Sequence, residues 1–137
     1  MNRLVHFEIH VGDEERAKQF YAAVFGWEFQ GWPIPAMGDQ PAQTYWGIIT
    51  GPKEEPGING GLVKRRGAAP AKGAPVSAFV CTMVGADVDV VVQKVVAAGG
   101  AVALPKFAIP GVGDMAYCID LDGNIFGLHK DTTKQAA

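Results

Sequence analysis

The chain carries the same order of secondary-structure signals twice, and this internal repeat limits the fold more than any other feature. In each half, a strand pattern precedes a helical stretch that ends at glycine, and three further strand patterns follow. The two helical stretches end at Gly26 and Gly99, which lie 73 positions apart. Because neither half alone could bury its sheet, the halves are expected to form one domain over residues 1–137. We predict an α+β chain of two tandem βαβββ modules.

Module one is assigned to residues 1–65. Its first strand is predicted over residues 4–11, where apolar and polar residues alternate. A helix is predicted between Asp13, a favourable N-cap residue, and Gly26, because apolar residues recur between them at helical spacing. The remaining predicted segments are a strand opening at Trp27, an irregular loop at 31–43, a strand at 44–50, a loop at 51–58 and a strand at 60–64.

Module two is assigned to residues 76–131, after a linker at 66–75 and before a tail at 132–137. Its helix, predicted over 86–98, is rich in β-branched valine, which disfavours helix, but the repeat and the two glycines that follow support it. Asp122 and Gly123 form the last predicted hairpin turn. The strands are predicted at 76–84, 101–104, 114–119 and 125–130.

Composition excludes several classes of function. With 137 residues, 48% hydrophobic content and a formal net charge of −2, the chain has the make-up of one compact domain. The only basic cluster is Lys64, Arg65 and Arg66, which is too small for a nucleic-acid surface. No apolar run is long enough for a membrane helix, and the start lacks a signal-peptide pattern, so we expect a cytoplasmic protein. Cys81 and Cys118 have no metal-finger or redox spacing.

Four segments carry a family likeness: HFEIHVGDEERAKQFYAAVFGWEF at 6–29, INGGL at 58–62, AAGG at 97–100 and PGVGDMAYCIDLDGNIFGLH at 110–129. Together they resemble the vicinal oxygen chelate superfamily, the group of glyoxalase I, bleomycin-resistance proteins and extradiol dioxygenases. The likeness covers nearly the whole chain in order, and it is specific for a fold rather than for a reaction. One departure is Leu121, which stands where the family usually has proline.

The resemblance implies two modules whose mixed sheets curl around a concave pocket, where enzymes of the family hold a divalent metal. Carried over by position, the first metal ligand is His6. The second falls at Gly60 or Gly61, the third near Ser77 and the fourth at Gly127. Glycine has no side chain and a lone serine binds first-row metals weakly. The resemblance therefore implies a degenerate metal site, and we expect no cofactor. The alternative is a bound divalent metal ion with His6 as one of its ligands.

His6, Glu8 and His10 share one face of the first predicted strand. Residues four apart on an extended strand lie about 13 Å apart, so His6 and His10 cannot share one metal ion without a bend. A metal site would need His6, Glu8 and a distant donor, for which His129 is the remaining histidine. Without a metal, these residues make hydrogen bonds in or near the pocket. Glu8 is then the candidate general base, although no catalytic residue can be assigned.

Aromatic side chains favour a pocket for a flat or apolar molecule. We therefore predict a glyoxalase-like or bleomycin-resistance-like protein that binds a small organic ligand. A metal-dependent lyase, isomerase or dioxygenase is the alternative, and an interaction module with a vestigial pocket is a third class. The predicted pocket residues are His6, Glu8, His10, Trp46, Ser77, Tyr117 and His129.

The segment 31–43 and its neighbours also predict a homodimer. They contain apolar side chains that a monomer of this size would struggle to cover. The alternative is that the segment folds over its own pocket as a lid. The apolar residues are Trp27, Trp32, Pro33, Ile34, Pro35 and Met37.

Overall fold

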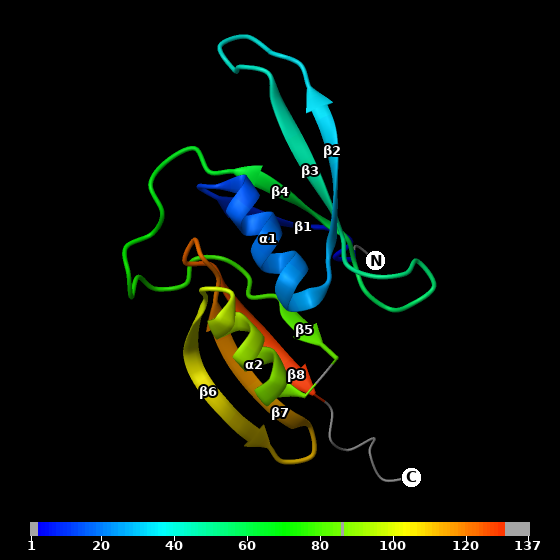
Figure 1. Cartoon of the computed structure of the whole chain (residues 1–137), viewed down its shortest axis with the longest axis vertical. Helices are drawn as coiled ribbons and strands as arrows, with labels where there is room; N and C mark the ends of the chain where they lie inside the picture. The colour runs from blue at the N-terminus through cyan, green and yellow to red at the C-terminus, as the bar shows by residue number, and fades with distance from the viewer. Residues whose placement is uncertain (1–2, 86, 131–137) are drawn as a thin grey trace. The chain divides into compact units, whose positions relative to one another are not determined.

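The repeat predicted from the sequence is present. A computed structural model describes residues 3–85 and 87–130 of the chain, which divides into two compact units between Ala69 and Pro70. Among these described residues, each unit contains one helix and one four-stranded mixed sheet, in the chain order βαβββ (Figure 1). The fold is therefore α+β, built from two modules of the same topology.

In the first unit the sheet order is β1-β4-β3-β2. Strand β1 runs parallel to β4, whereas β4 with β3 and β3 with β2 are antiparallel. Its elements are β1 (Phe7–Val11), α1 (Glu14–Phe25), β2 (Glu28–Ile34), β3 (Gln43–Ile49) and β4 (Gly60–Lys64).

The second unit repeats this arrangement with the sheet order β5-β8-β7-β6. Strand β5 is parallel to β8, and the other pairs are antiparallel. Its elements are β5 (Thr82–Val84), α2 (Val88–Ala97), β6 (Ala101–Ile109), β7 (Gly113–Ile119) and β8 (Ile125–Lys130).

Helix α1 begins and ends where the sequence predicts. The Asp13 carboxylate accepts a hydrogen bond from the Arg16 backbone N–H at 3.1 Å, and Gly26 adopts the left-handed conformation with φ 73°. The indole of Trp27 stacks on Tyr21, with ring centroids 5.1 Å apart and planes 6° from parallel. Trp27 is therefore buried, and its predicted place among the exposed apolar residues is wrong.

Helix α2 forms despite its valines because three of them share one face. Val88, Val91 and Val95 recur at helical spacing and are buried, so packing outweighs the weak helix preference of β-branched residues. The helix starts after Asp87, whose side chain accepts from the Asp89 N–H at 2.9 Å. The predicted start at Ala86 lies outside the described residues.

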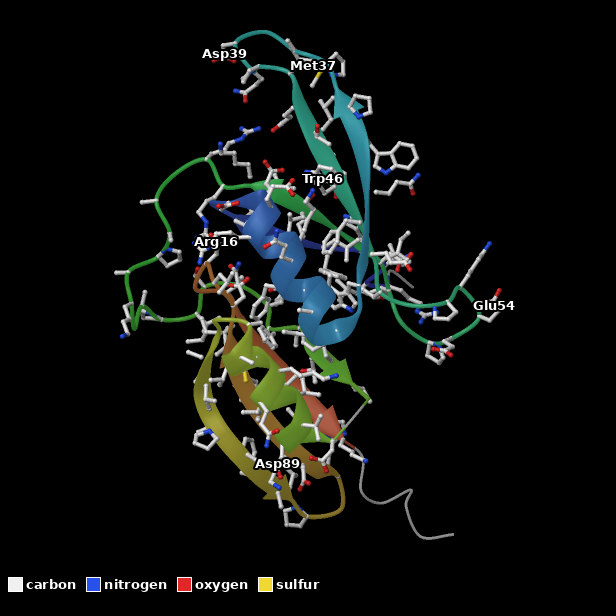
Figure 2. All side chains as sticks on the ribbon, viewed as in Figure 1. Arg16, Met37, Asp39, Trp46, Glu54 and Asp89 are labelled. Atoms are coloured by element: carbon white, nitrogen blue, oxygen red, sulfur yellow. The ribbon has the colours of Figure 1, made fainter. Side chains whose placement is uncertain are left out.

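The prediction of an irregular loop at 31–43 is wrong for both ends of that segment, which are strand. Residues 31–34 continue β2 and pair with 43–46 of β3, so a long hairpin replaces much of the loop. Pro33 lacks an N–H, but β2 is an edge strand with one neighbour, where proline is tolerated. Met37 and Asp39 lie at the tip of this hairpin (Figure 2).

Two strands are shorter than predicted because of the parallel register. Thr82 lies opposite Gly127, so residue 80 would face Ile125, the first residue of β8, and residues 76–79 have no partner strand. By the same logic Phe7 faces Gly60, the first residue of β4, and residues 4–6 precede the ladder. Strand β6 is longer than predicted and reaches Ile109, with register shifts on either side of Leu104.

The described residues contain no helix long and apolar enough to cross a membrane.

In the last hairpin Gly123 takes φ 82°, as the predicted turn requires. The loop is held by Asp120, whose carboxylate accepts from the backbone N–H groups of Asp122 and Asn124 at 2.8 Å each.

Candidate functional site

The first sheet presents one face to helix α1 and a second face, which we call the open face, on the other side. Side chains alternate between the faces, so residues paired across neighbouring strands share a face. Glu8 of β1, Gly61 of β4 and Gly47 of β3 form one such row on the open face. Tyr45 and Trp32 form a pair in the adjacent part of the ladder. Glycines thus lie between larger side chains and leave a depression in the sheet surface.

Tyr45 lies directly over Gly61. A methyl group at position 61 would overlap the hydroxyl oxygen and ring of Tyr45. The tyrosine can therefore reach from β3 across β4 to β1 only because residue 61 has no side chain. Its hydroxyl lies 2.9 Å from Nε2 of His6 and donates to Oε2 of Glu8 at 3.4 Å.

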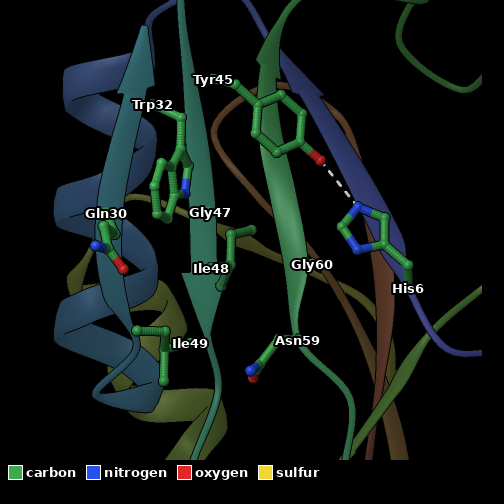
Figure 3. Close-up of a pocket in the computed structure, with 9 residues that line it drawn as sticks. All are labelled: His6, Gln30, Trp32, Tyr45, Gly47, Ile48, Ile49, Asn59 and Gly60. Carbon is green, nitrogen blue, oxygen red and sulfur yellow. Dashed lines mark hydrogen bonds between the residues drawn. The ribbon is translucent and has the colours of Figure 1, made fainter.

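A cavity of about 270 Å³ opens beside this tyrosine (Figure 3). Gly47 is in its floor, and a methyl group there would lie 3.3 Å from Nε1 of Trp32. Trp32 and Tyr45 flank the floor on either side, His6 lies beside Tyr45, and Asn59 lies apart from His6 on the other side of Gly60 (Figure 3). We call this cavity the slot, and the described residues that line it belong to the first unit: His6, Gln30, Trp32, Tyr45, Gly47, Ile48, Ile49, Asn59 and Gly60.

The nine lining residues include no lysine, arginine, aspartate or glutamate. The carboxylate of Glu8 contacts the Tyr45 hydroxyl rather than the slot. Burial, followed by the negative charge of Glu8 and the hydrogen bond to it, raises the pKa of Tyr45 above its ordinary value. Tyr45 therefore stays a neutral hydrogen-bonding phenol at physiological pH. The slot suits an uncharged ligand with hydrogen-bonding groups.

The structure connects the three predicted polar residues of the first strand through Tyr45. His6 contacts the tyrosine hydroxyl, the hydroxyl contacts Glu8, and the other Glu8 oxygen lies 3.2 Å from Nε2 of His10. Only His6 of the three lines the slot. The side chains of Glu8 and His10 are 45% and 53% exposed, so the contact between them is screened by water.

Trp46, also predicted as a pocket residue, lies on the face of the sheet toward helix α1 (Figure 2). Nζ of Lys18 from that helix lies 3.2 Å from the centroid of its ring, and the same ammonium group lies 2.7 Å from Glu15. Trp46 thus takes part in a cation–π contact in the layer between helix and sheet.

The other three predicted pocket residues belong to the second unit. Ser77 is exposed and lies outside the strands. The Tyr117 ring stacks on Phe107 with centroids 6.5 Å apart. His129 is half-buried on β8 and its Nδ1 lies 3.0 Å from the carbonyl oxygen of Asp114.

The residues at the inferred metal positions do not fit a metal site. In residues 3–85 and 87–130, no group of three or more histidine, cysteine, aspartate or glutamate side chains could hold a metal ion. Gly61 contributes no donor, and Tyr45 fills the space a side chain there would need. At Gly127 a side chain would meet Oγ1 of Thr82 at 2.8 Å. His6 is the one strong donor at these positions, and Tyr45 already engages one of its ring nitrogens.

Sequence reasoning did not place Tyr45, Gly47 and Asn59 in the site. Tyr45 and Gly47 have the same parity on their strand, which is a signal that they share a face. Which face of the sheet they share depends on the pairing of Gly47 with Gly61. The sequence alone does not determine the register between these two strands.

Residues 3–38 match the family model for the bleomycin resistance protein-like N-terminal region. Over 124 residues the chain is 32% identical to "Putative glyoxylase CFP32" of Mycobacterium tuberculosis (strain CDC 1551 / Oshkosh) and equally to that of Mycobacterium bovis. This match covers 88% of the chain but 42% of the mycobacterial proteins, so the chain spans about two fifths of the length of these relatives.

Solved structures share the fold at low sequence identity. A mutant of the FosX fosfomycin resistance protein of Listeria monocytogenes, complexed with Mn(II) and a dihydroxypropylphosphonic acid, has TM-score 0.67, 18% identity and coverage of 98% and 94% of the two chains. A mutant of maize (Zea mays) glyoxalase I has TM-score 0.71 and 21% identity over 93% of this chain and 44% of that one. TnmS3, an antibiotic binding protein from Streptomyces sp. CB03234, has TM-score 0.63, 23% identity and coverage of 96% and 98%.

Proposed function

Because the chain belongs to the vicinal oxygen chelate superfamily, we propose that it binds a small planar organic molecule in the slot, without a metal ion. The observation that carries this proposal is the glycine floor between two aromatic side chains. Gly47 puts no side chain into the slot, the Trp32 indole lies against it, and Tyr45 lines the other side. Flat ring systems gain stacking and apolar burial in such a setting.

The size and polarity of the slot support a ligand of one or two fused rings. A cavity of about 270 Å³ is at the small end for organic ligands. Trp32 is 54% exposed, so a ligand that covers its indole removes apolar surface from water. TnmS3, a structural neighbour matched over 98% of its length, is an antibiotic binding protein, which agrees with a binding role in this fold.

A metal-free site is supported by the filled space at Gly61. A carboxylate introduced there would have to displace Tyr45 and break its contact with His6. The alternative function is a metal-dependent lyase, isomerase or dioxygenase, which the position of His6 and the glyoxylase name of the mycobacterial relatives favour. Metal analysis of the purified protein separates the two, because a stoichiometric divalent ion contradicts the metal-free proposal.

We also propose that the protein forms a homodimer through the β2–β3 hairpin. Met37, which does not line the slot, is 63% exposed at the tip of this hairpin. A second copy of the chain would cover the same apolar side chains on both partners.

The test of ligand binding is an NMR titration with isoquinolin-1-one, a planar bicyclic lactam. The reporters are the Trp32 indole N–H, which lies against Gly47, and the backbone N–H groups of Gly47 and Gly60. We expect these signals to shift together and saturably. Trp32→Ala is expected to weaken binding at least about tenfold, because one stacking wall is lost.

Phe79→Ala is the matched control, since it removes an aromatic ring that is 93% exposed and lies in the second unit. It is expected to leave the affinity unchanged. The proposal is wrong if the reporters stay still, or if Trp32→Ala and Phe79→Ala bind the probe as the parent does.

A further inference from the structure

The hydrogen bonds around Tyr45 assign the proton on His6. A phenol has one proton to donate, and an ionised carboxylate can only accept. For both contacts to be hydrogen bonds at once, the Tyr45 hydroxyl donates to Oε2 of Glu8 at 3.4 Å and its oxygen accepts from His6 at 2.9 Å. This requires the His6 proton on Nε2. In the neutral imidazole the second ring nitrogen, Nδ1, then carries a lone pair. Figure 3 shows Nδ1 directed away from Tyr45, toward the side of Gly60.

Asn59 provides the opposite kind of group. Its Oδ1 accepts from the Thr50 backbone N–H at 3.0 Å, and since a backbone N–H can only donate, this contact fixes which end of the amide is oxygen. The amide nitrogen Nδ2, with two donor hydrogens, is the remaining end. Asn59 lines the slot, so Nδ2 is the polar group that it can offer to a ligand.

Both groups belong to the lining of the slot. His6 and Asn59 each immediately precede the first pair of the parallel ladder, Phe7 with Gly60. The lining therefore offers both a hydrogen-bond acceptor and a hydrogen-bond donor to one bound molecule.

We infer that the slot selects planar ligands with a hydrogen-bond donor next to an acceptor on one edge, as in a lactam, with His6 Nδ1 accepting and Asn59 Nδ2 donating. This inference rests on the proposed binding in the slot and names the ligand class. A lactam N–H matches the histidine lone pair, and its carbonyl oxygen matches the asparagine amide. An isostere that has a ring oxygen in place of the N–H would set two lone pairs against each other.

Glu8 is the positioning residue of this arrangement. It does not line the slot, but by accepting from Tyr45 it leaves the tyrosine oxygen to accept from His6. A glutamine at position 8 could keep accepting from His10 through Oε1 while its amide nitrogen donates to Tyr45. Tyr45 would then donate to Nε2 of His6, and the His6 proton would move to Nδ1.

The first experiment reads the tautomer. Long-range ¹H–¹⁵N NMR at about pH 8.5, above the ordinary titration range of histidine, distinguishes protonated from unprotonated ring nitrogens. A His6→Gln variant identifies the His6 signals. We expect the proton on Nε2 in the parent protein and on Nδ1 in Glu8→Gln. A parent protein with the proton on Nδ1 overturns the inference.

The second experiment compares isoquinolin-1-one with isocoumarin, which has the same shape and a ring oxygen in place of the N–H. We expect isocoumarin to bind the parent protein about tenfold more weakly, and this preference to disappear in Glu8→Gln. Glu54→Gln, an exposed loop carboxylate, is the matched control and should keep the preference (Figure 2).

The outcomes separate this inference from the proposed function. If both probes shift the Trp32 and Gly47 signals with equal affinity, the ligand class is wrong and binding in the slot stands. If neither probe shifts them, both proposals are wrong. If the parent prefers the lactam and Glu8→Gln prefers it equally, the role assigned to Glu8 is wrong.

Discussion

Substituting Gly61 by alanine tests whether Tyr45 depends on the bare backbone beneath it. The added methyl group would overlap the hydroxyl and Cζ of Tyr45 and lie 2.9 Å from its Cε1. All three atoms belong to the outer part of one side chain, so the tyrosine can swing away while the strands stay paired. We expect Gly61→Ala to fold, and to lose the contacts of Tyr45 with His6 and Glu8.

The expected loss of stability follows from two terms. The 2.9 Å contact with His6, the shorter of the two hydrogen bonds lost, contributes about 0.5 to 1.5 kcal/mol, and forcing an extra methyl group into a packed site costs about 1 to 3 kcal/mol. Because Tyr45 is only half-buried and can relax toward solvent, the sum should fall near the low end, at about 1 to 2 kcal/mol. Urea denaturation followed by circular dichroism measures this difference.

A double-mutant cycle with Tyr45→Ala isolates the contact. Without the tyrosine ring, the alanine at position 61 has nothing to displace, so its cost should fall to nearly zero. Gly51→Ala is the matched control, because no atom lies within 4 Å of an added methyl group there. The reasoning is refuted if Gly61→Ala costs the same with and without Tyr45, or if it costs no more than Gly51→Ala.

Three further predictions concern the core, the thiols and the assembly. Phe20 is 2% exposed, so Phe20→Ala should lower the free energy of unfolding, measured by urea denaturation, by about 3 to 5 kcal/mol. Phe25→Ala should lower it less, because Phe25 is half-buried. A loss below about 1 kcal/mol for Phe20→Ala contradicts the helix packing. Burial raises the pKa of the Cys118 thiol, so a thiol reagent at about pH 8 should modify the exposed Cys81 quickly and Cys118 only after unfolding, whereas equal rates contradict its burial. Sedimentation at micromolar concentration should give twice the 14.5 kDa mass of one chain, and a mass near 14.5 kDa excludes the proposed dimer.

Local signals predict the first helix and several strands well. Asp13 and Gly26 mark the ends of α1 as expected, and the predicted strands at 60–64 and 125–130 have the bounds of β4 and β8. The internal repeat supports α2 against its own composition. These features depend on residues close together in the sequence, which a single sequence displays directly.

Features that depend on pairing between distant segments are not predicted. Residues 76–81 have strand character, but β8 offers no partner for residues 76–79, so most of the segment stays outside the sheet. Trp27 follows a helix stop, where the sequence predicts exposure, yet Tyr21 covers it. In each case the sequence sets the local preference, while the register or the packing partner decides the outcome.

The same limit applies to the site. Alternation places His6 and Glu8 on one face, and the structure joins them through Tyr45. The reach of Tyr45 over Gly61 requires the register of three strands. Tyr45 and Trp46 are adjacent aromatics on opposite faces, and sequence alone could not decide which of them faces the slot.

The central claim, that the slot binds a planar ligand without metal, is tested most directly by one affinity comparison. The dissociation constant of isoquinolin-1-one is measured by NMR on protein treated with EDTA and dialysed, and again after addition of Mn²⁺ or Zn²⁺. His6 keeps its contact with Tyr45 in this account, so the two constants should agree within about twofold. Binding that appears only with metal, or tightens more than about tenfold when metal is added, would contradict the account.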